Sequence, residues 1–321
     1  MKKPSFTTAI GIDIGGTWIK VGLVRSSRIL FAESIPTKKF ATPRKLQKGL
    51  VETVRIIRQK SKVRISGVGI GVPGLVRYPE GIVHTCANLP GWRDVPLKAL
   101  LQRELHLPVW VDNDVNLMTL GEWVYGAGRG VENLVCMTLG TGVGGGLILE
   151  GHLYRGSGGW AGEIGHMPLN QVGPPCSCGG MACLERYVGN KEILQGVRAQ
   201  LRRGVKSRIP ELVGPRGELT HSIIDRACEL GDPLARKIWE QVGIRIGIVC
   251  AGLVNLLNPD RIVIGGGISK AGRWLFIPLR KTVRQRAMRG PGKVEIVPAR
   301  LGSSAGMIGA AFLARMSENR E

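Results

Sequence analysis

The chain has 321 residues, 43% of them apolar, so it is long enough for two globular domains with sizeable cores. Its 45 lysines and arginines exceed its 24 acidic residues and give a formal charge of +21. That excess favours anionic partners such as nucleotides or nucleic acid, although a solvated basic surface explains it equally well. An odd number of cysteines, seven, argues against a disulfide framework.

We expect neither a secretory signal nor a membrane span, and therefore a cytoplasmic protein. The first residues run straight into a strand-like pattern without a long apolar stretch. The densest apolar run, Val242 to Leu257, is interrupted by Arg245 and Asn255 and is too short to cross a bilayer.

The chain begins with a predicted hairpin. Ala9–Asp13 reads as a buried strand and Trp18–Val24 as its partner, with Gly15, Gly16 and Thr17 at the bend. A tight glycine bend exposes backbone N–H groups, which suit phosphate. Asp13 beside it is a carboxylate able to approach Mg²⁺.

Helices and strands then follow in turn. Apolar residues at helical spacing, a strand-like apolar run stopped by Pro73-Gly74, and the capping residues Asp112, Asn113 and Asp114 indicate these elements. The predicted helices are Thr42–Lys60, Val95–Leu105 and a third that ends near Tyr125, and the predicted strands are Ile65–Val72 and Val109–Val111.

A second strand, glycine bend and return strand appear at Leu134–Leu139, Gly140–Gly146 and Leu147–Glu150. Because this unit repeats the first one, we predict an internally duplicated fold with one phosphate-contacting hairpin in each half. The glycines at 140, 142 and 145 also match G-x-G-x-x-G, but that fingerprint must open a helix, and Leu147 onward is strand-like. The sequence contains no P-loop motif.

The last third adds a predicted helix from Asp232 to Leu257, a strand at Arg261–Ile264 and a closing helix at Ala305–Met316. The closing helix is rich in small residues, so we expect it to pack closely on a neighbour, with Ser303 or Ser304 as its cap. The strand ends in a third glycine cluster. Each cluster alone is consistent with a simple turn, but together they predict binding of a nucleotide triphosphate. The predicted phosphate-binding residues are Gly15, Gly16, Thr17, Gly140, Thr141, Gly142, Gly265, Gly266 and Gly267, with Asp13.

Three cysteines, Cys176, Cys178 and Cys183, fall within eight residues, and His166 lies ten residues upstream. Three thiolates and one imidazole suit tetrahedral zinc. All four positions would be filled by protein, so the ion would be structural and would hold a loop in shape. The alternative is that these are ordinary thiols with a histidine nearby by chance.

This set of motifs resembles the ROK family of sugar kinases and repressors, from about Ile10 to Ala314. The matching stretches are Asp13–Thr17, Gly71–Gly74, Asn88–Trp92, Asn113-Asp114, Leu139–Gly142, Glu163–His166 and the cysteine cluster that ends in Glu185. The resemblance implies the two-domain α/β fold of actin/hexokinase-like (ribonuclease H-like) ATPases, with an interdomain cleft. It implies a small N-terminal domain of residues 1–118 plus 302–321, and a larger domain of residues 119–301 that carries the zinc loop.

The resemblance also implies roles for single residues. Asp114 would be the general base that takes the proton from a sugar hydroxyl as it attacks the γ-phosphate of ATP, with Mg²⁺ as cofactor. The other hydroxyls would be held by Asn88, Asn113, Glu163, His166 and Glu185. Simpler interpretations stay open: Asp114 as a helix cap, Glu163 and Glu185 as surface acids, and Asn88 as a turn residue.

Three residues depart from the family pattern: Ala182 replaces a usual glycine, Val115 a usual alanine and Ser303 a common acid. None removes a polar group of the expected site. We expect an ATP-dependent kinase acting on a hexose, most simply glucose at its 6-hydroxyl, and a homodimer or homotetramer. Polyphosphate as the donor is compatible with the basic surface.

The rival expectation is a ROK-type sugar-responsive regulator or a nucleic-acid-binding protein without kinase activity. About eight residues precede the first predicted strand, too few for a helix-turn-helix, so we expect no nucleic-acid partner.

Overall fold

The computed structural model describes residues 8–40, 42–86 and 91–318, which divide into two compact α/β units. The first unit contains Met1–Glu132, Gly146–Gly162 and Arg300–Glu321, and the second contains Asn133–Gly145 and Glu163–Ala299. The predicted domain boundaries near residues 118 and 302 stay a prediction.

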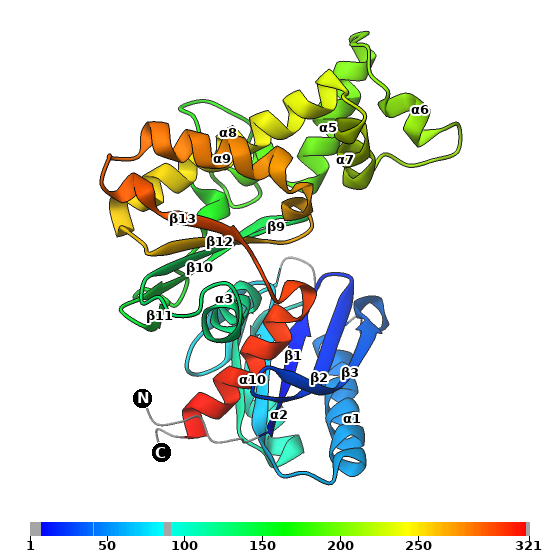
Figure 1. The fold of residues 1–321 in the computed structure, drawn as a ribbon. Coiled ribbons are helices and arrows are strands. Elements are labelled where there is room, and N and C mark those ends of the chain that lie inside the picture. Colours follow the sequence, from blue (N-terminus) through cyan, green and yellow to red (C-terminus); the bar gives the residue numbers. More distant parts are fainter. Residues whose placement is uncertain (1–7, 41, 87–90, 319–321) are drawn as a thin grey trace. The chain divides into compact units, whose positions relative to one another are not determined.

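The first unit is built on a five-stranded sheet with the order β3-β2-β1-β4-β8 (Figure 1). Strands β1 and β2 form the predicted hairpin, β3 pairs antiparallel with β2, and β4 and β8 run parallel to β1. The apolar runs of β1 and β4 are almost wholly buried because helices cover both faces. The strands are β1 Thr8–Ile14, β2 Trp18–Arg25, β3 Arg28–Pro36, β4 Ile65–Val72 and β8 Val109–Asn113.

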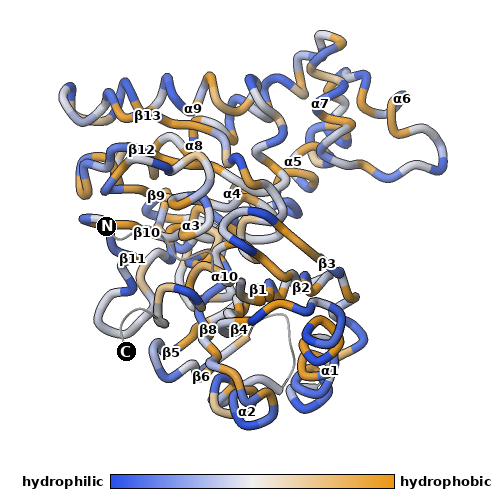
Figure 2. The backbone as a smooth tube through the Cα atoms, turned by 60° about the horizontal axis from the view of Figure 1, so that its bottom comes forward, coloured by the Kyte–Doolittle hydropathy of each residue, from blue (hydrophilic) through white to orange (hydrophobic). Residues whose placement is uncertain are grey.

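On one face lie α1, Pro43–Ser61, and α2, Leu97–Leu105. The hydroxyl of Thr42 caps α1 by accepting the Lys45 N–H, and the leucines, valine and isoleucine expected on the inner face are buried. Figure 2 shows apolar and polar residues alternating along this helix. The hydrophobic spacing in the sequence therefore predicted its core-facing side correctly.

On the other face lies α10, Ala305–Glu318, which packs against β1, β4 and α3, Asp114–Tyr125. A Cβ atom on Gly11 would lie 1.9 Å from the Met307 carbonyl oxygen, and one on Gly69 would lie 1.9 Å from that of Ala310. Only glycine permits such a backbone-to-backbone approach, which confirms the expected close packing of the small-residue helix. A 3₁₀ turn, Gly302–Ser304, leads into it.

The second sheet repeats this order as β11-β10-β9-β12-β13, and the division between the units falls within β10. Strands β12 and β13 run parallel to β9, as β4 and β8 do to β1. The duplication expected from the two glycine hairpins is therefore present in the strand order. The strands are β9 Leu134–Leu139, β10 Val143–Leu149, β11 His152–Tyr154, β12 Arg261–Gly265 and β13 Glu295–Pro298.

Two long helices, α8, Pro233–Leu257, and α9, Arg273–Arg286, pack against each other beside this sheet (Figure 1). By length and composition alone α8 could cross a membrane, but half of its apolar stretch is buried inside the protein. Its inner residues, such as Trp239 and Ile246, belong to the core.

The remaining elements are short. A three-stranded sheet consists of β5 Leu75–Arg77, β6 Ile82–Thr85 and β7 Arg93–Val95, and the second unit adds α4 Glu185–Val188, α5 Asn190–Arg202, α6 Ile209–Val213 and α7 His221–Glu229. The other 3₁₀ turns are Thr37–Lys39, Ile164–His166, Ile268–Ala271 and Pro291–Lys293.

Two predicted boundaries were wrong. Val95 belongs to β7, and α2 begins at Leu97, because a residue that precedes proline, here Pro96, is disfavoured in a helix. The second glycine bend is shorter than expected, since β10 already begins at Val143 and includes Gly144 to Gly146.

Candidate functional site

Three acidic residues of the first unit, Asp13, Asp112 and Asp114, lie at the carboxyl ends of three parallel strands. In register, Asp13 of β1 lies opposite Gly71 of β4, and Gly71 lies opposite Asp112 of β8. Ligands of open α/β sheets bind beyond this edge of the sheet. Asp13 and the Asn113-Asp114 pair therefore lie at the edge where substrate is expected.

Asn113 is the cap of α3. Its Oδ1 accepts the N–H groups of Val115 and Asn116 at 2.8 and 3.1 Å, and its Nδ2 donates to the Gly74 carbonyl at 3.1 Å. Asp114, the first helical residue, is half-buried, and its Oδ1 lies 3.0 Å from the Val115 nitrogen. Asp114 thus lies in the first turn of α3, at the positive end of the helix dipole.

Asp112 fixes the position of that turn. One carboxylate oxygen, Oδ2, accepts from Arg155 Nε and Nη2 at 2.8 and 2.7 Å, and Oδ1 accepts from the Asn113 backbone and from Asn116 Nδ2 at 2.7 and 3.0 Å. The Arg155 guanidinium also lies 3.8 Å from the centre of the Tyr78 ring. Sequence reasoning missed Arg155, because it lies 43 positions from its partner.

Asp13 is a partly buried carboxylate beside the first glycine bend. Burial raises its pKa above the ordinary value, and the charge of Lys20, opposite it on β2, opposes that shift. Lys20 donates to the Ser303 carbonyl at 2.6 Å, and a Cβ on Gly306 would lie 2.8 Å from Asp13 Cγ, so the start of α10 closes in on Asp13. A partly buried acid of this kind fits a divalent cation such as Mg²⁺.

The bend itself is fastened from within the first unit. Gly15 donates its N–H to the Trp18 carbonyl, while Thr37 donates its N–H to Thr17 and its hydroxyl to Gly15. Gly16 and Thr17 stay exposed. The bend thus offers a rigid, accessible stretch of backbone, as phosphate binding needs.

The two other glycine clusters come together in the second unit. Gly265 at the end of β12 pairs with Thr138 of β9, directly before the Gly140–Gly142 bend. Gly266 has φ +87°, and a Cβ there would lie 2.2 Å from the Leu139 carbonyl oxygen, so the contact between the clusters requires glycine. Residues 15–17 belong to the other unit. Since β10 follows the second bend, the dinucleotide-fingerprint reading is excluded.

Glu185 is attached to this second bend. Its Oε2 accepts the Val143 N–H at 2.8 Å, and a Cβ on Gly142 would lie 2.5 Å from that oxygen. The Asn190 N–H donates to the Gly140 carbonyl on the other side. A residue expected to hold sugar is therefore anchored to a loop expected to hold phosphate.

His166 lies between an acid and the cysteines. Its Nε2 lies 3.8 Å from Glu163 Oε2, and its Nδ1 lies 3.6 Å from Cys176 Sγ. The Glu163 side chain is 46% exposed, yet desolvation by its surroundings is the main reason why its pKa is raised; His166 lowers it and Glu185 raises it further. The last residue predicted to hold sugar, Asn88, lies outside the described residues.

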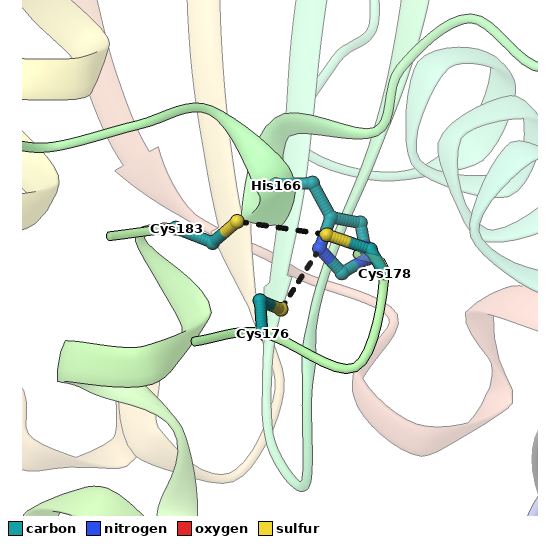
Figure 3. Close-up of side chains that lie close together, drawn as sticks. All are labelled: His166, Cys176, Cys178 and Cys183. Atoms are coloured by element: carbon teal, nitrogen blue, oxygen red, sulfur yellow. Dashed lines mark hydrogen bonds between the residues drawn. The ribbon is translucent and has the colours of Figure 1, made fainter. Parts of the chain in front are cut away.

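His166, Cys176, Cys178 and Cys183 point toward one another (Figure 3), and their donor atoms lie within 4.8 Å of one another. Ordinary zinc bond lengths in a tetrahedron give edges of about 3.8 Å between sulfurs and about 3.6 Å between sulfur and nitrogen. The distances from Cys178 Sγ to Cys183 Sγ, 3.7 Å, and from Cys176 Sγ to His166 Nδ1, 3.6 Å, agree with these edges. The cluster fits a structural zinc ion.

Comparison with known protein families agrees with this arrangement. The sequence model of the family described as "ROK family" matches residues 9–317 of this chain. The chain belongs to the ROK family. It is 36% identical to a glucokinase of Halalkalibacterium halodurans, over 97% of this chain and 96% of the relative. It is 33% identical to a xylose repressor of Caldicellulosiruptor bescii, over 87% of this chain and 70% of the relative.

Among solved structures, a ROK family glucokinase from Streptomyces griseus in complex with glucose and AMPPNP superposes with a TM-score of 0.81 at 32% identity. The match covers 96% of this chain and 99% of that one. The actin/hexokinase-like fold expected from the sequence is confirmed.

One departure from the ROK pattern has a structural consequence. Ala182, where glycine is usual, has φ +56° and is fully buried in the cysteine loop. A left-handed backbone costs an L-residue roughly 1–2 kcal/mol. This ROK protein therefore keeps a strained residue next to Cys183.

Proposed function

We propose that this ROK protein is an ATP-dependent hexokinase that transfers the γ-phosphate of ATP to the 6-hydroxyl of glucose. The likeness to glucokinases over almost the whole chain supports this activity. The observation that carries the mechanism is the position of Asp114, in the first turn of α3 at the carboxyl edge of β1, β4 and β8, with Asn113 as the cap. Its carboxylate is thus not required as the helix cap.

In the proposed reaction, Asp114 accepts the proton of the 6-hydroxyl. The oxygen forms a bond to the γ-phosphorus while the bond from that phosphorus to the bridging oxygen of ADP breaks. Asn113 and Asp112 hold the turn so that the carboxylate stays in one place. Positioning and charge stabilisation account for most of the acceleration in such reactions.

The other hydroxyls are assigned to Glu163, His166 and Glu185 of the second unit, and to Asn113 and Asn88 of the first. Carboxylates each accept several hydroxyl hydrogen bonds, so a group of them selects hydroxyl stereochemistry. If Nδ1 of His166 held the zinc ion, its Nε2 would carry the proton and would donate to a sugar oxygen or to Glu163.

The phosphates are assigned to the exposed backbone of the glycine bends at 15–17, 140–142 and 265–267. Asp13 would hold Mg²⁺, which neutralises phosphate charge when bound. In this proposal the zinc ion has no part in the chemistry and keeps the loop of Glu163 and Glu185 in shape.

The test is a coupled assay of ADP formation with glucose, mannose, fructose and N-acetylmannosamine, with zinc quantified on the same sample. We expect turnover with glucose and about one zinc per chain. Absence of turnover with all four sugars would refute the enzyme proposal.

A sugar-responsive regulator is the second candidate, because a xylose repressor is similar to most of this chain. A gel-shift titration separates the two, since real phosphate contacts on DNA make binding fall steeply with salt. Cytoplasmic location and a homodimeric or homotetrameric state also stay predictions, and light scattering measures the latter.

A further inference from the structure

The second unit contains a cationic hollow that the proposed reaction does not use. Its volume is about 630 Å³, and the residues that line it belong to the end of α9, the turn after it and the edge strand β13. The polar side chains that line it are Arg280, Arg284, Arg289, Lys293 and Glu295. Arg284, Arg289, Lys293 and Glu295 lie before or at the beginning of β13, whereas the glycine clusters follow the ends of β9 and β12. Because these strands are parallel, their beginnings and their ends lie at opposite edges of the sheet, so the hollow is separate from the proposed nucleotide site.

Its charge is not balanced locally. Glu295 is held by Arg261 Nε at 2.6 Å, and no carboxylate of the described residues pairs with Arg284, Arg289 or Lys293, all of which are exposed. Between Arg273 and Glu295 the sequence has seven basic residues and one acid. Like charges gathered at a hollow attract and concentrate anions.

A second basic hollow, between α1 and α2, provides a comparison. It has a volume of about 440 Å³ and is lined by Arg44, Lys48, Arg55 and Arg103, but also by Glu52 and Glu104. Arg55 reaches Glu104 at 4.0 Å. There two carboxylates of the lining supply counter-charge, whereas at the hollow beside β13 the one lining carboxylate, Glu295, is already paired with Arg261.

The edge strand is closed to another strand. Arg280 donates through Nε and Nη2 to the Ile296 carbonyl at 3.0 and 2.6 Å. The Ala299 N–H donates to the Ile264 carbonyl of β12, so the backbone groups of Ala299 point toward β12. Backbone groups of successive residues in a strand point to alternate sides, so those of Ile296 and Pro298 point away from β12. Proline has no N–H to donate there. A peptide added to this edge would thus find its partners blocked.

We propose that this hollow binds a small anion carrying two or more phosphate groups. Guanidinium groups match phosphate oxygens in paired, charge-assisted hydrogen bonds. A single phosphate would contact only part of a hollow of this size, whereas a phosphate chain can span Arg284, Arg289 and Lys293. Inorganic polyphosphate and nucleoside polyphosphates share this chemistry.

The test is calorimetric titration of the full-length protein with tripolyphosphate, using Arg284→Gln/Arg289→Gln as the variant. Arg44→Gln/Lys48→Gln is the matched control, because it removes the same charge from the other hollow. We expect Kd for one class of sites to rise at least about tenfold in the variant and to stay within about twofold in the control. An equal rise in both, or no rise in either, would overturn the proposal.

Further titrations identify the source and the size of the anion. Equal affinity for tripolyphosphate and ATP at this site means that the site recognises only the phosphate chain. Tighter binding of ATP means that the nucleoside also makes contacts. Either result supports the proposal. Binding of inorganic phosphate as tight as that of tripolyphosphate contradicts it, as does variant-sensitive binding of a DNA duplex alone. Hexokinase turnover of the variant should equal that of the parent, and the titration is interpretable even if the parent shows none.

Discussion

The two five-stranded sheets share one strand order, but the two units hold their proposed reactive groups by different means. In the first, Asp114 lies where a strand becomes a helix, and backbone N–H groups, Asn113 and Asp112 fix the turn. In the second, Glu163 and His166 lie on an irregular loop that ends at the cysteine cluster. The first arrangement depends on regular hydrogen bonding, whereas the second depends on long-range contacts and, in our proposal, on a metal ion.

The largest expected effect tests the first arrangement. Asp114→Asn keeps the size of the side chain but removes the base, so kcat should fall about 10³-fold, within the usual range for a general base. Glucose affinity, measured by calorimetry, should change less than about threefold, because the hydroxyl contacts of the second unit are intact. A variant that keeps most of its rate would show that another residue takes the proton.

Asp13→Asn should cost about 10²–10³-fold in kcat/KM for Mg-ATP, as expected for loss of the charged group proposed to hold the Mg²⁺ that stabilises phosphate charge. Burial raises the folded-state pKa of Asp13, so this group favours folding at acid pH and that contribution is lost as the pH rises through the folded pKa. At neutral pH the ionised carboxylate therefore costs stability, and the variant should unfold at a higher temperature when no nucleotide is present.

The same shift sets the sign of a pH effect on the parent enzyme. Activity should fall as the pH drops through a pKa above the ordinary aspartate value, because protonated Asp13 cannot hold Mg²⁺. Raising the Mg²⁺ concentration should move this fall in activity to lower pH, since the metal competes with the proton for the carboxylate. If the acid side of the pH–activity profile did not shift with Mg²⁺ concentration, a group other than Asp13 would be responsible for the fall.

The second arrangement is tested by Cys176→Ser. Zinc content should fall from about one per chain toward zero, and kcat/KM for glucose should drop about 10–100-fold, mostly through KM. Cys228→Ala, another buried cysteine of the same unit, is the control and should keep zinc and KM. Loss of zinc with an unchanged KM would mean that the loop holds its shape without the ion.

The same contrast explains what the sequence predicted. Helix α1 followed from its apolar spacing, α3 from its capping residues and the cysteine cluster from its short spacing, because each signal is local. The sequence did not indicate α9, where basic residues and the internal Pro278 obscure the pattern.

Contacts between distant residues could not be predicted at all. Arg155 reaches Asp112 across 43 positions, and Glu185 reaches Val143 across 42. Both contacts exist only because separate elements fold against each other, so composition and periodicity carry no trace of them. They decide how Asp114 is fixed and how Glu185 is tied to the phosphate bend.

The smallest expected effect concerns Ala182, next to the proposed zinc ligand Cys183. Replacement by glycine removes the left-handed strain, roughly 1–2 kcal/mol, but loses a buried methyl group, about 0.8 kcal/mol, and adds about 0.4–1 kcal/mol of chain entropy to the unfolded state. The free energy of unfolding should therefore change by less than about 1 kcal/mol. Ala251→Gly, buried in α8 without positive φ, has no strain to relieve and should cost about 2 kcal/mol. Chemical unfolding of both variants measures the difference, and an equal loss in the two would show that the backbone at Ala182 is not strained.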